Sequence, residues 1–284
     1  MAGAVFSTLL QLPGYLMRKK ALDIRPEPGI RIISCNVRYL NFEDQGNRSW
    51  FCRADKLLGA VAREAPGIIG FQEVTRWQYR YLVDTLPGYD SVITYRDDTR
   101  WAEGCPVFYH KSLYTLVDKG SFWLSETPEV MSRDWGAGCY RVCSYVILRE
   151  KVSGKDFAVF NTHLDHASDE ARIGGIRVVM DKITRFGGLP SVIMGDFNAE
   201  EGSATYENVT GHFHDARYAA ENTDPTGTFH GWGQLESVRI DYFMLSKTGF
   251  RIHRYGVVDV ARNGVYASDH SPIRLDVTLT ETIP

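Results

Sequence analysis

An apolar segment in the last third of the chain ends in side chains suited to hydrolysis. Residues 192–199 read Val-Ile-Met-Gly-Asp-Phe-Asn-Ala. Because side chains alternate across a β-strand, we expect Asp196 and Asn198 to point the same way at its carboxyl end, with Phe197 in the packing. A carboxylate beside an amide can hold a water or a metal and donate to an oxyanion. Asp and Asn also favour turns, so this pair alone leaves a polar turn as the alternative.

Five other apolar segments carry polar side chains of the same kind, at the start, in the middle or at the end of the segment. Strand ends in a layered α/β protein converge on one crevice. The six segments together bring Asn36, Glu73, His163, Asp196, Asn198, Asp241, Asp269 and His270. Asp165 and His166 have weaker claims, since Asp165 could anchor His163 or cap the next helix, and His166 could be a ligand or a loop residue. So many coincidences are improbable by chance, and they predict a single site.

In this order the chain resembles the endonuclease/exonuclease/phosphatase superfamily over about residues 30–279. The strings Gly-Asp-Phe-Asn at 195–198 and Ser-Asp-His-Ser-Pro at 268–272 are the most specific, and Phe-Gln-Glu at 71–73 and Asn-Thr-His-Leu-Asp-His at 161–166 add to them. The superfamily includes DNase I, exonuclease III-like repair nucleases, bacterial sphingomyelinases, inositol polyphosphate 5-phosphatases and nocturnin-type deadenylases. The resemblance implies an α/β fold, a four-layer αββα sandwich of two packed β-sheets with outer helices, and an active site across one end.

The resemblance also implies a bound magnesium ion as cofactor. Glu73 would hold the ion, Asn36 would orient it or the phosphate, and Asp269 would lie beside it through water. A hard carboxylate suits magnesium, which keeps several waters. Manganese should substitute, because both ions take oxygen ligands in octahedral geometry. Taken alone, Glu73 would instead be a surface salt-bridge partner.

The same resemblance assigns catalytic roles to five residues. Asp196 would orient or deprotonate the attacking water, and Asn198 would bind the phosphate oxygens. His270 would stabilise the pentavalent phosphorus as an imidazolium, and Asp241 would orient it and favour its charged form. His163 matches a histidine that assists the leaving group in the DNase I and sphingomyelinase branches, whereas repair nucleases place other residues there.

Four further residues are expected to contact the substrate. Glu103 begins a Glu-Gly-Cys-Pro string that resembles the deadenylase-type acid-Gly-Cys-Ala motif, with proline in place of alanine. It could contact the substrate or support the metal site. Arg141 or Arg133 is available for a second anionic group, and Trp232 for stacking on a ring. In related enzymes an arginine at the position of Arg172 often packs near the site, although a solvated helix charge is an equal alternative.

Composition limits the size of the substrate. The chain has 284 residues, 44% of them hydrophobic, with a net charge of -3 and a pI near 6.2. Long nucleic acid is gripped by many Lys and Arg contacts, which this charge does not supply. We therefore expect a small phosphoester, or the end of a short single strand, read by aromatic segments at Trp101, 122–135 and 229–232. These loops resemble those of bacterial, largely uncharacterised members, for which the resemblance gives a reaction class but no firm substrate.

The chain is expected to be one domain, residues 1–284, with its core at about 30–279. Residues 1–29 would be an amphipathic extension whose helix, within 4–17, packs on the domain and is neither a signal peptide nor a membrane span. The five cysteines follow no disulfide or metal spacing, which favours a reducing, cytoplasmic setting. We also expect a monomer.

Hydrophobic periodicity and turn signals predict the elements that position the site. Helices are expected at 49–65, 76–85 and 168–185. Strands are expected at 30–36, 68–72, 89–94, 106–109, 113–124, 139–150, 157–162, 191–194, 237–245, 250–258 and 273–279.

The leading hypothesis is a magnesium-dependent phosphoesterase that hydrolyses a phosphodiester or phosphomonoester by attack of water. The alternative enzyme is a DNA or RNA nuclease, or a deadenylase, acting on nucleic-acid ends. A catalytically inactive binding module on the same fold is the alternative of another class, and the complete set of catalytic side chains speaks against it. A sphingomyelinase or toxin would need a secretion signal and an exposed apolar hairpin, and the sequence shows neither clearly.

Overall fold

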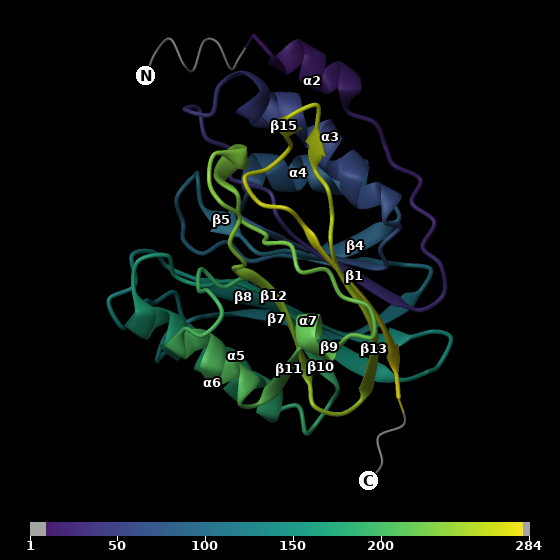
Figure 1. The fold of residues 1–284 in the computed structure, drawn as a ribbon, viewed down its shortest axis with the longest axis vertical. Helices are drawn as coiled ribbons and strands as arrows, with labels where there is room; N and C mark the ends of the chain where they lie inside the picture. Colours follow the sequence, from purple (N-terminus) through teal and green to yellow (C-terminus); the bar gives the residue numbers. More distant parts are fainter. Residues whose placement is uncertain (1–9, 281–284) are drawn as a thin grey trace.

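Two six-stranded β-sheets lie face to face in this protein, with helices on their outer sides (Figure 1). The computed structural model describes residues 10–280. Across the first sheet the strands are β13 (Phe250–Val257), β16 (Ile273–Leu279), β1 (Ile30–Asn36), β2 (Ile68–Gln72), β6 (Val107–His110) and β4 (Tyr89–Val92). Across the second they are β11 (Phe213–Asp215), β12 (Asp241–Ser246), β10 (Ser191–Asp196), β9 (Asp156–His163), β8 (Val142–Glu150) and β7 (Tyr114–Trp123). The predicted four-layer αββα sandwich is confirmed.

The remaining elements cover the sheets and close one end of the sandwich. The helices are α2 (Leu12–Arg18), α3 (Trp50–Arg63), α4 (Arg76–Thr85), α5 (Asp169–Thr184), α6 (Ala204–Thr210) and α7 (Ala216–Ala219), with the 3₁₀ turns η1 (Gly46–Arg48) and η2 (Gly231–Gly233). The short strands are β3 (Val74–Thr75), which pairs with β5 (Glu103–Gly104), and β14 (Ala261–Arg262), which pairs with β15 (Val265–Tyr266). None of the helices within residues 10–280 is long and apolar enough to cross a membrane.

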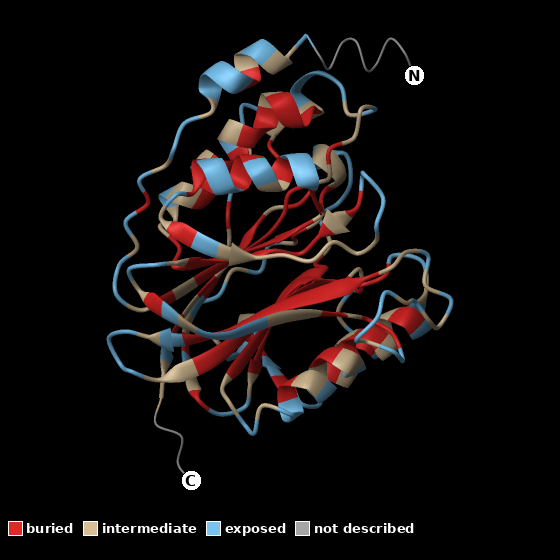
Figure 2. Cartoon of the chain, turned by 180° about the vertical axis from the view of Figure 1, so that it is seen from behind, coloured by how far each residue is buried: buried red, intermediate tan, exposed pale blue. Residues whose placement is uncertain are grey.

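Alternation of side chains along the central strands builds three apolar layers, because both faces of each sheet are covered. Ile32 on β1 and Val192 on β10 pack between the two sheets. The next residues face outward: Ile33 packs towards α3 and α4, and Ile193 packs towards α5. The buried residues accordingly fill both sheets and the inner faces of the helices (Figure 2).

The glycine of the Gly-Asp-Phe-Asn string is required by the close approach of β10 to β9. Gly195 has φ +140°, and a Cβ atom there would lie 1.8 Å from the carbonyl oxygen of Thr162. Only glycine avoids both the strain and the clash. Phe197 is buried in the layer between the second sheet and its helices, as expected.

All the predicted strands and helices form, with ends shifted by a few residues. The largest shifts are at the starts of β8 and β12, which begin at Val142 and Asp241 instead of near 139 and 237. The expected N-terminal helix is present as α2, where Tyr15 stacks on Tyr81 with ring centroids 4.9 Å apart. The part of that prediction at residues 4–9 lies outside the described residues. The sequence patterns gave no sign of α6, β11 and α7, because these elements are only three to seven residues long.

Candidate active site

The same alternation that builds the core directs polar side chains between the sheets at one end. Asn36 ends β1, Asp196 ends β10 and His163 ends β9, each on the face that packs against the other sheet. Asn36 Nδ2 donates a hydrogen bond to Asp196 Oδ2 at 3.0 Å, so the two sheets are joined at the site. Beneath them, Gln72 Nε2 donates to Asn161 Oδ1 at 2.6 Å, and this buried bond forms the floor.

Glu73 is turned into the site by an unusual backbone conformation. It lies between β2 and β3 with φ 61°, in the left-handed region that costs free energy for a non-glycine residue. Its Oε1 accepts from Asn36 Nδ2 at 3.1 Å and its Oε2 from the backbone N–H of Tyr39 at 2.9 Å. These two bonds fix the carboxylate, and strain of this kind is typical of functional sites.

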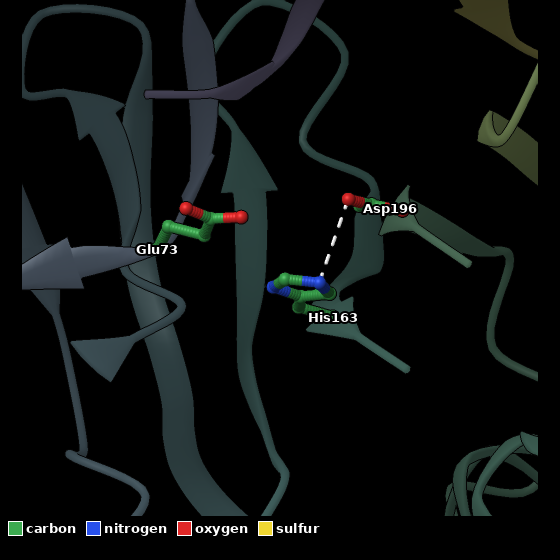
Figure 3. Close-up of side chains that lie close together, drawn as sticks. All are labelled: Glu73, His163 and Asp196. Carbon is green, nitrogen blue, oxygen red and sulfur yellow. Dashed lines mark ion pairs between the residues drawn. The ribbon is translucent and has the colours of Figure 1, made fainter. Parts of the chain in front are cut away.

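A compact group of possible metal ligands lies at the meeting point of the sheets. One ligand atom each from Glu73, His163 and Asp196 lies within 4.8 Å of the others. Figure 3 shows the carboxylate of Glu73 pointing towards the imidazole of His163 and the carboxylate of Asp196. Two carboxylates in a recess suit a hard divalent cation that keeps part of its water shell. Asp269 also lines the recess, but it faces Arg38 Nε at 3.8 Å and is not in this group.

His270 and Asp241 form a buried charged pair beside Asp196. His270 Nδ1 lies 2.9 Å from Asp241 Oδ2, and its Nε2 lies 3.6 Å from Asp196 Oδ2. Burial by itself lowers the pKa of His270, but the Asp241 and Asp196 carboxylates outweigh it and raise the pKa to about 10. Burial raises the pKa of Asp196 to about 7, with Asp241 adding to the shift and His270 opposing it. The pair therefore supplies a hydrogen-bond donor that stays charged at neutral pH.

His163 differs from His270 in its charge. Burial lowers its pKa well below the ordinary value, and the nearby cations Arg141 and His270 lower it further. Asn198 Nδ2 lies 2.8 Å from His163 Nε2, and since an amide N–H only donates, this ring nitrogen is the acceptor. The 3.5 Å contact from His163 Nε2 to Asp196 Oδ2 is thus made by a neutral ring. Asn198 lies beyond the end of β10 with φ 48°, a left-handed conformation that turns its amide towards His163.

These residues open into a cleft of about 910 Å³. Glu103 lines it and is paired with Arg96 at 2.9 Å, and burial raises the pKa of Glu103 to about 7. Arg141 also lines the cleft, and its Nη2 lies 2.9 Å from His166 Nδ1. The cleft walls include several residues that the sequence patterns did not single out: Arg38, Tyr39, Leu40, Asn41, Phe42, Glu43, Arg96 and Thr99. Only the position of Arg38, two residues after Asn36, could have drawn attention to this segment.

Two of the residues expected to contact the substrate do not line the cleft. Trp232 lies over the guanidinium groups of Arg48 and Arg53, 5.6 and 5.4 Å from its ring centroid. Arg172 donates to the carbonyl oxygen of Asp165 at 2.8 Å and pairs with Asp169. Both side chains bind parts of the protein itself, which a local sequence pattern does not reveal.

Comparison with known proteins agrees with this geometry. The chain belongs to the Endonuclease/Exonuclease/phosphatase family, which it matches over residues 33–270. It is similar to an endonuclease/exonuclease/phosphatase from Bacteroides vulgatus, with 30% identity, a TM-score of 0.84, and coverage of 89% of this chain and 100% of that one. A mannosyl-6-phosphatase from Bacteroides thetaiotaomicron has 31% identity, a TM-score of 0.81, and coverage of 88% and 99%. An uncharacterized protein of Acanthamoeba polyphaga mimivirus is 23% identical over 86% of this chain and 98% of its own length. The chain is thus a hydrolase of phosphate esters.

The Asp241–His270 pair leads to a prediction about pH. Asp241→Asn keeps a hydrogen-bond acceptor but removes the charge that most strongly raises the pKa of His270. If the imidazolium is the active form, turnover is lost as pH rises through this pKa, so the alkaline limb should move to lower pH in the variant. Profiles of kcat from pH 6 to 11 test this. Asp90→Asn, at an exposed position on β4, is the control, and an unmoved limb in Asp241→Asn would contradict the assignment.

Proposed function

We propose that this protein is a magnesium-dependent phosphoesterase that hydrolyses a compact phosphomonoester or phosphodiester. The observation that carries the proposal is the meeting of Glu73, Asp196 and His163 within one recess, beside the charged His270. In the proposed site Glu73 holds the ion and Asn36 fixes the Glu73 carboxylate. Magnesium, when bound, would neutralise charge on the phosphate oxygens.

The side chains divide the work of hydrolysis. Asp196 orients the attacking water and accepts its proton. His270 donates a hydrogen bond to a phosphate oxygen that gains charge in the transition state. Asn198 Nδ2 donates to His163 and to the carbonyl oxygen of Leu164 in the free protein, and it donates a second bond to the phosphate when the substrate displaces one of these partners. His163 is the other imidazole that contacts Asp196. Its Nε2 accepts from Asn198, so the neutral ring carries its proton on Nδ1, and we assign to that N–H the support of the leaving oxygen.

The outer part of the cleft fits a small ring better than a long duplex. Phe42 and Trp101 meet edge to face at its rim, with ring centroids 5.6 Å apart, and Trp101 is 45% exposed. Asn41, Glu43 and Thr99 beside them can bind hydroxyl groups. The net charge of -3 supplies no extended basic face, and one relative of 31% identity is a mannosyl-6-phosphatase. A sugar phosphate is therefore our first candidate substrate.

A substrate panel with magnesium tests this proposal. It should contain mannose 6-phosphate and other hexose phosphates, nucleotides, cyclic dinucleotides, a short single-stranded oligonucleotide, phospholipids and supercoiled plasmid. We expect the highest kcat/KM for a compact ester. Efficient nicking of the plasmid would favour a nuclease, shortening of the oligonucleotide from its end would favour a deadenylase-like enzyme, and no hydrolysis at all would favour a binding module.

Trp101→Ala is expected to lower kcat/KM for the preferred substrate about 5-fold, mainly through KM, because stacking on an exposed aromatic ring contributes about 1 kcal/mol. Steady-state kinetics measure the effect. Trp77→Ala is the matched control, since Trp77 is 51% exposed on α4 and does not line the cleft. Equal KM values for Trp101→Ala and the wild type would remove Trp101 from the substrate site.

The cysteines bear on where the protein works. All five are free thiols, and three of them, Cys35, Cys105 and Cys143, are buried. Free thiols persist in reducing compartments, which supports our proposal of a cytoplasmic enzyme.

A further inference from the structure

Arg53 carries a buried charge directly behind the active site. It lies on α3, only 1% exposed, and within residues 10–280 no carboxylate forms an ion pair with it. Burial lowers the pKa of its guanidinium to about 10. A buried charge without an ionic partner is costly, so other contacts must stabilise it. The identity of those contacts indicates what the residue does.

Backbone carbonyl oxygens take the place of a carboxylate. Arg53 Nε donates to the carbonyl oxygen of Arg48 at 2.8 Å, and Nη2 donates to the carbonyl oxygen of Arg38 at 2.7 Å. Nη1 donates to the carbonyl oxygens of both Val37, at 2.5 Å, and Ala267, at 3.1 Å. The four acceptors belong to three segments, and the one that contains Ala267 is far from the other two in the sequence. One planar group therefore joins η1, the segment after β1 and the segment after β15.

The segment after β1 helps to fix Glu73, the proposed metal ligand. Asn36 ends the strand, and Tyr39 donates its backbone N–H to Glu73 Oε2 at 2.9 Å. Between them Arg38 has φ 54°, a conformation that is unfavourable for a non-glycine residue. The bond from Arg53 to the Arg38 carbonyl stabilises this turn, and the turn aims the Tyr39 N–H at Glu73.

The segment after β15 leads to His270. Ala267 is followed by Ser268, Asp269 and His270, and Ser268 Oγ donates to the carbonyl oxygen of Asn36 at 2.8 Å. The Nη1 atom of Arg53 thus binds one carbonyl on each side of the site. β15 lies against η1, the 3₁₀ turn that comes just before α3, the helix that supplies this side chain.

Two indole rings flank the guanidinium. Its Cζ atom lies 5.1 Å from the ring centroid of Trp50 and 5.4 Å from that of Trp232. Cation–π attraction of this kind stabilises a charge that has lost its water. Trp232 is half-buried and is held with φ 65° inside η2. This position explains why Trp232 does not reach the cleft.

We propose that Arg53 is a positioning residue that fixes the metal-binding segment relative to the His270 segment, with Trp232 covering it. The inference rests on the proposed metal-dependent function and names a residue that serves the same site. Lysine cannot replace it, because an ammonium group lacks the planar fork that reaches four carbonyl oxygens at once. A purely structural role would cost stability alone, whereas a positioning role also weakens metal binding and turnover.

Arg53→Lys in the full chain tests the inference, with Mn²⁺ titrated by electron paramagnetic resonance and with kcat and KM measured on the preferred phosphoester. We expect Mn²⁺ binding at least about 10-fold weaker and kcat at least about 10-fold lower, with KM little changed. Arg274→Lys is the control. Arg274 is a partly buried arginine on β16, and it pairs with Glu64 and Asp276. This variant should lose thermal stability and keep both Mn²⁺ binding and kcat. Wild-type Mn²⁺ binding and kcat in Arg53→Lys would overturn the inference.

A second pair of variants covers the case in which Arg53→Lys does not fold. Trp232→Ala should weaken Mn²⁺ binding about 3-fold, and Trp232→Phe should restore it, because a phenyl ring still faces the guanidinium. Identical Mn²⁺ affinities in Trp232→Ala and the wild type would then count against Arg53. A wild-type protein that binds no Mn²⁺ and hydrolyses no phosphoester would instead overturn the proposed function, and this inference with it.

Discussion

Asp196→Asn and His270→Ala should each lower kcat at least about 100-fold while the protein stays folded. Asp196 is the carboxylate that contacts both imidazoles, at 3.5 Å from His163 and 3.6 Å from His270. Asparagine keeps the shape but cannot accept the proton of the attacking water. Loss of His270 removes a charged donor aimed at the transition state, an effect of the same order. Steady-state kinetics with a thermal melt for each variant check the prediction.

The melts separate catalysis from folding. Asp196 Oδ2 accepts from Asn36 Nδ2 and Oδ1 accepts from the Asn198 N–H, so the single oxygen of an asparagine keeps one of these bonds and its amide nitrogen faces the other donor. We therefore expect Asp196→Asn to melt somewhat below the wild type but to stay folded at the assay temperature. His214→Ala, at an exposed position on β11, is the control for removal of an imidazole. Near wild-type turnover in a variant with a normal melt would show that its residue is not catalytic.

The parts of the site that could be predicted from the sequence are those set by local rules. Asp196 and Asn36 follow apolar strands, and side-chain alternation alone places them on the inner face of their sheets. The family strings around His163 and His270 then assign them to the same end of the sandwich. None of this required knowledge of which strands are neighbours.

The parts that could not be predicted depend on contacts between distant segments. Trp232 has the aromatic setting of a substrate-binding residue, yet its ring lies on Arg53, which is distant in sequence. Arg53 itself has the appearance of an ordinary helix charge, and its four carbonyl partners are visible only in three dimensions. The left-handed turn at Arg38 follows from those same bonds, so it carries no sequence signal of its own.

Removal of divalent cations should abolish turnover, and magnesium or manganese should restore it. The reason lies in the recess, where Glu73 and Asp196 place carboxylate oxygens within 4.8 Å of one another. Within residues 10–280, no cationic side chain donates a hydrogen bond to both carboxylates. The donor that they share is the neutral amide of Asn36. A cation would relieve the repulsion of these carboxylates and bind the substrate phosphate at the same time. Assays in excess EDTA, with each metal then added back, measure the dependence.

Glu73→Gln tests whether the metal dependence rests on the Glu73 carboxylate. Both carboxylate oxygens of Glu73 accept hydrogen bonds, from Asn36 and from the Tyr39 N–H, so an amide nitrogen would face a donor in either orientation. The variant loses the charge that attracts the ion as well as part of its fixed geometry. It should need at least about 10-fold more magnesium for half-maximal activity. Glu129→Gln, an exposed carboxylate that does not line the cleft, should behave as the wild type. Full turnover in EDTA, or an unchanged magnesium requirement in Glu73→Gln, would mean that the recess does not hold the catalytic ion.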